Sequence, residues 1–264
     1  MTIKFLSAAL ATTALVSLAP PAFAQDKTGT NAGTAAADAA PGGAATMGLA
    51  QELFALGVAQ GDAVTVLAAA KLAASVSTEE KTPGILELPV DELAALSVRS
   101  SAGAARARAM SSDATVLLAT GGTATSEEEG AADAPVTADA MFAKATELAA
   151  GDEAVLGLIT DAMAEGSRGR IGGATEWLSR LPAGMTDVWE VPFYGNSYAE
   201  VAVVGDGDAN LDVAITDENG NVICYDVSWS DKLYCDWTPS WDGYFYVTVQ
   251  NMGGSRNSYY LMTN

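Results

Sequence analysis

Closely spaced alternating stretches in the last third of the chain constrain the fold most. The range Gly205–Trp237 reads GDGDANLDVAITDENGNVICYDVSWSDKLYCDW. Apolar and polar residues alternate over Leu211–Thr216, which is typical of a strand with one buried face. The pair Asn219-Gly220 tolerates positive φ and permits the chain to reverse into the next strand. This stretch therefore predicts antiparallel strands joined by tight turns.

Short strand patterns continue on both sides of that stretch, separated by Gly, Asn, Asp or Pro. Short strands with turn residues between them indicate a β-sandwich and not a parallel sheet. The strands are expected at about 187–193, 197–204, 210–216, 222–226, 232–237, 244–250 and 257–263. The side chains expected to face inward are Trp189, Val191, Phe193, Phe245, Val247, Val249, Tyr259 and Leu261.

A set of features in this region resembles the bacterial pre-peptidase C-terminal domain. The features are the acidic loop before Leu211, the Asn219-Gly220 turn, Trp237-x-Pro239, Gly243 before an alternating strand, and Asn257-x-Tyr259-x-Leu261. The resemblance covers about 187–264 and implies a small jelly-roll-like sandwich of the kind appended to secreted bacterial proteins, peptidases especially. No HExxH or Gly-x-Ser-x-Gly motif precedes it. The resemblance therefore implies fold and secretion, not proteolysis.

The N-terminus is typical of an export signal. Lys4 supplies a positive start, Phe5–Leu18 is apolar, and Ala22-Phe23-Ala24 is a small-residue cleavage site. We therefore expect residues 1–24 to be removed as a signal peptide and the mature protein to be periplasmic or secreted. No later run is long and apolar enough to span a bilayer, so no membrane insertion is expected after cleavage.

Charge and the missing histidines disfavour several functions. The chain has 33 acidic and 13 basic residues, a formal net charge of −20 and no histidine. Such a charge disfavours nucleic acid and anionic membrane surfaces as partners. Without histidine, Ser-His-Asp and Cys-His catalysis and nearly every catalytic zinc site are excluded. We therefore expect a protein that is not an enzyme.

Upstream of the sandwich, the composition predicts helices joined by weakly ordered segments. Residues 25–47 are mostly Ala, Gly, Thr and Asp and predict a disordered linker. Residues 48–180 predict a helical region with a flexible insert at about 99–136, and the sandwich is expected at 181–264. The chain as a whole is expected to be α+β and multidomain.

Two helical hairpins are expected within that region. Gly61-Asp62 and Gly151-Asp152 each separate two apolar helical stretches, with Gly ending one helix and Asp capping the next. The two hairpins need each other to bury their apolar faces, which favours a four-helix unit. Their similarity fits a decayed repeat, and it fits chance likeness between Ala-rich helices equally well.

The cysteines Cys224 and Cys235 are the only two in the chain. They fall on neighbouring predicted strands of one sheet, where a bridge is geometrically feasible. In an oxidising compartment two cysteines most simply form one disulfide. Closing a loop of about a dozen residues would stabilise the fold by roughly 3 kcal/mol.

The acidic loop before Leu211 is the candidate metal site, and Ca²⁺ is the candidate cofactor. Its oxygen-bearing side chains are Asp206, Asp208, Asn210 and Asp212, with Asp217 as a further ligand from the next loop. Oxygens at this spacing can wrap Ca²⁺, and some relatives of the resembled family bind calcium. The alternative is a solvated turn whose Asp and Asn side chains bond their own backbone.

Two more groups of residues have competing interpretations. The cluster Trp229, Trp237, Trp241, Tyr234 and Tyr244 either stacks on sugar rings or packs into the core. Arg168 and Arg170 either bind an anion or pair with carboxylates. The resulting hypothesis is an exported non-enzymatic protein whose sandwich is a binding or stabilising module, with a protein or cell-surface glycan as partner. The alternative is a calcium-dependent carbohydrate or cell-surface binding protein.

Overall fold

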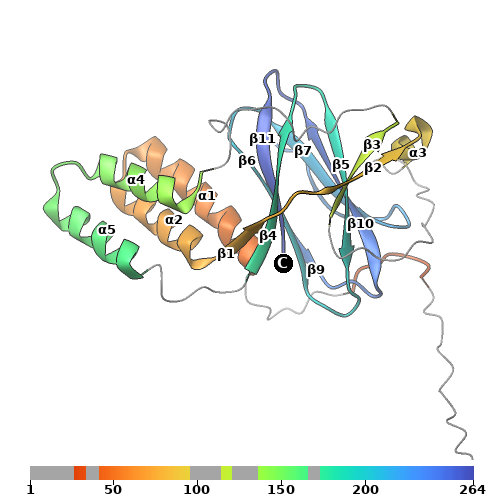
Figure 1. Ribbon diagram of the computed structural model, residues 1–264, viewed down its shortest axis with the longest axis horizontal. Helices are drawn as coiled ribbons and strands as arrows, with labels where there is room; N and C mark the ends of the chain where they lie inside the picture. The colour runs from red at the N-terminus through yellow and green to blue at the C-terminus, as the bar shows by residue number, and fades with distance from the viewer. Residues whose placement is uncertain (1–26, 34–41, 96–113, 121–135, 166–172) are drawn as a thin grey trace, which may run out of the picture.

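In the computed structural model two β-sheets face one another, and a helical unit covers the outer face of one of them (Figure 1). The structure describes residues 27–33, 42–95, 114–120, 136–165 and 173–264. The predicted signal peptide at 1–24 lies outside these residues, as do Arg168, Arg170 and most of the insert predicted at 99–136.

The first sheet has five strands in the order β1-β4-β11-β6-β9. Its strands are β1 Ser77–Glu80, β4 Gly173–Leu181, β6 Ala199–Gly205, β9 Lys232–Trp237 and β11 Asn257–Thr263. All neighbours pair antiparallel except β1, which runs parallel to β4.

The second sheet has six strands in the order β2-β3-β5-β10-β7-β8. Its strands are β2 Gly84–Leu88, β3 Thr115–Ala119, β5 Thr186–Phe193, β7 Leu211–Asp217, β8 Val222–Asp226 and β10 Gly243–Asn251. Here β2 and β3 run parallel. The α+β class is confirmed, and the strands predicted between 187 and 264 pair with one another antiparallel as expected. The two parallel pairs are formed by the upstream strands, β1 with β4 and β2 with β3.

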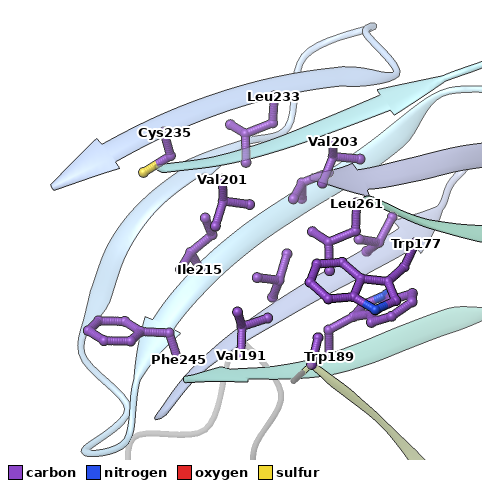
Figure 2. Packing of buried hydrophobic residues seen from close by; sticks show 14 of the residues in the cluster. Trp177, Trp189, Val191, Val201, Val203, Ile215, Leu233, Cys235, Phe245 and Leu261 are labelled. Atoms are coloured by element: carbon purple, nitrogen blue, oxygen red, sulfur yellow. The ribbon is translucent and has the colours of Figure 1, made fainter. Parts of the chain in front are cut away.

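The apolar core lies between the inner faces of the two sheets, as Figure 2 shows for residues of both. All the side chains predicted to face inward belong to it. Phe193, Trp237 and Phe245 form a ring cluster at one end, with centroids 5.0–5.7 Å apart in edge-to-face and tilted arrangements. Such aromatic pairs stabilise beyond the apolar area that they bury.

The predicted disulfide between Cys224 and Cys235 is present, with Cα atoms 6.5 Å apart. Its expected position within one sheet is wrong. Cys224 lies on β8, an edge strand of the six-stranded sheet, and Cys235 on β9, an edge strand of the five-stranded sheet. The bridge therefore ties the two sheets together along one open edge of the sandwich.

The helical unit consists of α1 Gly43–Gln60, α2 Ala63–Ser75, α4 Ala138–Leu148 and α5 Glu153–Glu165. The two predicted hairpins pack together, with α2 in contact with α1, α4 and α5. Gly61 ends α1 in the left-handed conformation, and Asp62 accepts the Val64 N–H to begin α2. Thr137 caps α4 in the same way.

The helical unit is docked on the outer face of the five-stranded sheet. Ala174, Ala202, Val204 and Met262, from β4, β6 and β11, join helix side chains in one apolar cluster. The buried Glu200 of β6 accepts the Ala44 N–H at 3.0 Å in the first turn of α1. A carboxylate at a helix N-terminus satisfies an orphan donor and complements the helix dipole. Sheet and helices are thus joined by polar as well as apolar contacts.

The structure differs from the expected division of the chain. Residues 27–33, expected in a disordered linker, lie along the sandwich, with Gly33 bridged to Thr238, and α1 begins at Gly43. The expected helical region at 48–180 contributes β1, β2 and β3 to the two sheets, and the continuous run of sandwich strands begins at Gly173 with β4, before the expected boundary at 181. The short helix α3 (Val90–Ala95) packs on the outer face of the six-stranded sheet.

Among the residues that the structure describes, no helix has the length and apolar character needed to cross a membrane.

Candidate functional site

The acidic loop predicted to bind calcium is held by its own hydrogen bonds. The carboxylate of Asp206 accepts the Asp208 N–H at 3.0 Å with one oxygen and the Ser258 N–H at 2.8 Å with the other. The pKa of Asp206 is raised, mainly by partial burial, although these two backbone bonds lower it. Asn210 donates to Asp212 at 3.3 Å. The alternative interpretation, a turn that bonds its own backbone, describes Asp206 well.

Asp217 lies at the opposite end of β7 from that loop. Six residues of extended strand separate it from Leu211, or roughly 20 Å. Its buried carboxylate accepts the N–H groups of Asn31, Asn219 and Asn221 at 2.8–2.9 Å. The structure therefore does not bring Asp217 into one site with the loop residues, and its role is to close the β7–β8 turn.

Asp231, which sequence reasoning missed, completes the acidic loop from the β8–β9 connection. One oxygen accepts the Gly207 N–H at 2.6 Å and the other pairs with the Lys232 ammonium at 3.1 Å. Within the described residues no three or more His, Cys, Asp or Glu side chains are placed to hold a metal ion. The predicted ligands do not fit Ca²⁺ as a set.

We expect calcium not to stabilise this protein. A ligand that binds only the folded state at a hundredfold excess over its Kd would add about 2.7 kcal/mol. Melting curves in EDTA, in millimolar CaCl₂ and in MgCl₂ of equal ionic strength should superimpose. A rise in melting temperature that occurs only with Ca²⁺ and is lost in Asp208→Ala would contradict this expectation.

The aromatic cluster proposed to stack on sugars is not brought together on the surface. Trp237, Trp241 and Tyr244 are 3–6 % exposed and belong to the interior. Trp241 donates its indole N–H to Glu218 at 2.8 Å. Trp229 is 98 % exposed and Tyr234 42 %. The packing interpretation therefore holds for three of these residues, and the other two do not form a platform with them.

A cleft lies where the helical unit meets the five-stranded sheet. This cleft has a volume of about 420 Å³, within the range of pockets that hold small organic molecules. It is lined by Met47, Gln51, Ala73, Ala74, Val76, Thr78, Val136, Thr137, Ala138, Asp139, Phe142, Met163, Glu176 and Tyr260. These residues come from stretches far apart in the sequence, chiefly 47–51, 73–78 and 136–142, with Met163, Glu176 and Tyr260 further along.

Strand alternation places the polar residues of the cleft. Trp177 of β4 and Tyr259 of β11 point into the core of the sandwich. Their neighbours Glu176 and Tyr260 therefore point outward, toward the helices. Thr78 approaches from β1, which is paired with β4. On the helical side, α4 contributes the buried ring of Phe142 and the carboxylate of Asp139 at its first turn.

Acidic side chains of the sheet act on the polar wall of the cleft. Burial raises the pKa of Glu176, the negative charge of Glu80 raises it further, and a hydrogen bond from Thr78 lowers it. Burial, together with the charges of Glu176 and Glu80, raises the pKa of Tyr260 to about 12, so its hydroxyl keeps its proton at neutral pH. Among the described residues that line the cleft, none is Lys or Arg.

This arrangement is suited to binding. The helices and the residue before α4 supply an apolar wall from Met47, Val136, Phe142 and Met163, and the sheet supplies a carboxylate and two hydroxyl groups. The only sequence signal for the site was Glu176 beside the apolar Trp177 and Leu178, and a glutamate there also fits a solvent-facing strand position.

No protein-family model matches the chain, and no curated protein matches it. One similar solved structure is the pre-peptidase C-terminal domain of collagenase from Bacillus anthracis, at 17 % identity over 34 % of this chain and 88 % of that one, with a TM-score of 0.29. Another is the carbohydrate-binding module CBM36 in complex with calcium and xylotriose, at 12 % identity over 37 % of this chain and 82 % of that one, with a TM-score of 0.23. At this identity and TM-score, each comparison supports only a β-sandwich-like fold in part of the chain. Neither structure assigns the chain to a family.

Proposed function

We propose that this chain is an exported, non-enzymatic binding protein of the periplasm or cell exterior, and that its ligand is a small organic molecule held in the cleft. The single observation that carries the proposal is the 420 Å³ cleft at the junction of the two structural units. Interfaces between structural units are common places for ligand sites. In this proposal the sandwich stabilises the helical unit and forms the polar wall of the cleft.

Export and the absence of catalysis rest on the sequence. The Ala22-Phe23-Ala24 site supports removal of residues 1–24, and the disulfide suits an oxidising compartment. The chain has no histidine, which removes the commonest general acid and base. The runner-up function, calcium-dependent glycan binding, is tested by the melting curves described above.

We expect a side chain that fills the cleft to abolish binding. Ala74 lies on α2 and lines the cleft, so Ala74→Phe should occupy the space that a ligand needs. Ala68 lies on the same helix but is exposed and outside the cleft, so Ala68→Phe is the matched control. Ligand-observed NMR with a library of water-soluble compounds should find some that bind the natural protein and Ala68→Phe but not Ala74→Phe. A library with no such compound would overturn the proposal.

A further inference from the structure

We propose that the ligand of this cleft is an organic cation, with an ammonium group seated on Glu176 and a hydrocarbon body against the helices. This inference rests on the proposed function and adds the chemical class of the ligand. It follows from the charges, the hydrogen bonds and the apolar wall of the cleft.

Charge is the first step. The two carboxyl-bearing side chains that line the cleft are Glu176 and Asp139. Glu80 on β1 adds a third negative charge close enough to act on Glu176 and Tyr260. Arg180 on β4 acts on Tyr260 but is not one of the lining residues. A cationic ligand would supply the positive charge that the lining side chains do not.

The partial burial of Glu176 is the second step. Taking a carboxylate out of water is costly unless it is paired, and the ordinary response is a raised pKa. Thr78 gives Glu176 a neutral hydrogen bond, which is weaker than a charge-assisted one. An ammonium group should therefore bind this partly buried carboxylate more tightly than an exposed one.

The apolar wall is the third step and favours an organic cation over a bare inorganic one. Met47, Val136, Phe142 and Met163 offer a hydrocarbon and thioether surface, and Phe142 and Tyr260 offer aromatic rings. Ring faces attract ammonium groups, and methionine adapts to varied ligand shapes.

The N-terminus of α4 also lines the cleft and would by itself attract an anion. In this protein, side chains of the chain itself already interact with the first turn of α4. The Thr137 hydroxyl accepts the Ala140 N–H at 3.3 Å, and Asp139 places a carboxylate in the first turn of the helix. The acidic side chains therefore decide the sign of the ligand.

The test compares hexylamine, hexanol and hexanoate, which share a hydrocarbon chain and differ in charge. In isothermal titration calorimetry at neutral pH, hexylamine should bind about tenfold or more tightly than hexanol, because a hydrogen bond to a charged group is the stronger kind. Hexanoate should bind least. Glu176→Gln should remove the advantage of the amine and leave hexanol unchanged. The matched control Glu79→Gln removes the same charge from an exposed residue of β1 outside the cleft and should change neither.

The pH dependence supplies a second readout. A proton and an ammonium group compete for the Glu176 carboxylate, so amine affinity should fall as the pH falls through the pKa of Glu176, while hexanol affinity stays constant. Glu80, Asp139 and Tyr260 are the other titratable groups around the cleft, and Glu176→Gln shows how much of the pH effect they cause. Equal binding of amine, alcohol and carboxylate, each blocked by Ala74→Phe, would overturn this inference and leave the proposed function standing. Amine binding that Ala74→Phe does not block would overturn both.

Discussion

Replacing Tyr259 with Phe is expected to lower the free energy of unfolding by about 4 kcal/mol, because two buried groups lose a partner at once. The Tyr259 hydroxyl donates to the Asp187 carboxylate at 2.6 Å and accepts the Trp189 indole N–H at 2.7 Å. All three side chains are buried between the sheets or at their edge. The substitution removes one oxygen atom and leaves the ring in place.

The size of this effect follows from burial. A hydrogen bond to a charged group contributes about 1.5–3 kcal/mol, and a buried polar group without a partner costs about 1–3 kcal/mol more. Burial, with the adjacent Asp187 charge, raises the pKa of Tyr259 well above its ordinary value, so the hydroxyl remains a donor over the accessible pH range. Ser179 also donates to the same Asp187 oxygen, at 2.6 Å, and holds the carboxylate in position.

Urea denaturation followed by circular dichroism measures the effect. Tyr194→Phe is the matched control, since that hydroxyl is on an exposed side chain and its loss should change stability by less than about 0.5 kcal/mol. Near-ultraviolet circular dichroism reports whether Tyr259→Phe keeps its aromatic packing. Equal stabilities of the two variants would show that the hydroxyl network does not hold the core.

The strands of the sandwich were predictable because their signal is local. Alternation over Leu211–Asp217 and Gly243–Asn251 marks a buried face within a few residues, and the predicted strand ends agree with the observed ones to within about two residues. The added strands had no such signal. Ser77–Glu80 is polar and largely exposed, and Thr115–Ala119 lies in a stretch dominated by Ala, Ser and Thr. Their pairing partners, not their own sequence, make them strands.

The candidate site could not be predicted for a related reason. Its lining residues run from Met47 to Tyr260, and only the docking of the helices on the sheet brings them together. Asp217 shows the converse error. It sits in an acidic stretch that suggests a ligand, but its oxygens are occupied by donors from Asn219, Asn221 and the distant Asn31. The sequence alone does not show that a carboxylate is hydrogen-bonded when its donor lies far away in the chain.

The second large expected effect on stability comes from Asn31, the distant partner of Asp217. Residues 27–33, here called the N-terminal strap, cross the end of the sandwich, and Asn31 is fully buried there. Its side-chain oxygen accepts the N–H groups of Ser240 and Trp241 at 2.8 and 3.1 Å, and its amide donates to the Trp241 carbonyl at 3.1 Å. Asn31 thus completes the hydrogen bonding of the β9–β10 connection.

Replacing Asn31 with Ala should lower the free energy of unfolding by about 3 kcal/mol, because buried backbone groups of the β9–β10 connection lose their partners. The strap should also loosen, because it loses its buried side-chain anchor. It then keeps the backbone bonds of Asn31 to Asp217 and of Gly33 to Thr238, and the exposed bonds that Asn219 and Asn221 donate to the Lys27 and Gly29 carbonyls. Hydrogen exchange measured by mass spectrometry should therefore speed up in peptides that cover the strap and the β7–β8 turn. Thr30→Ala is the matched control, because its side chain is exposed in the same strap. If both variants unfold at the same urea concentration and exchange alike, the strap is not anchored through Asn31.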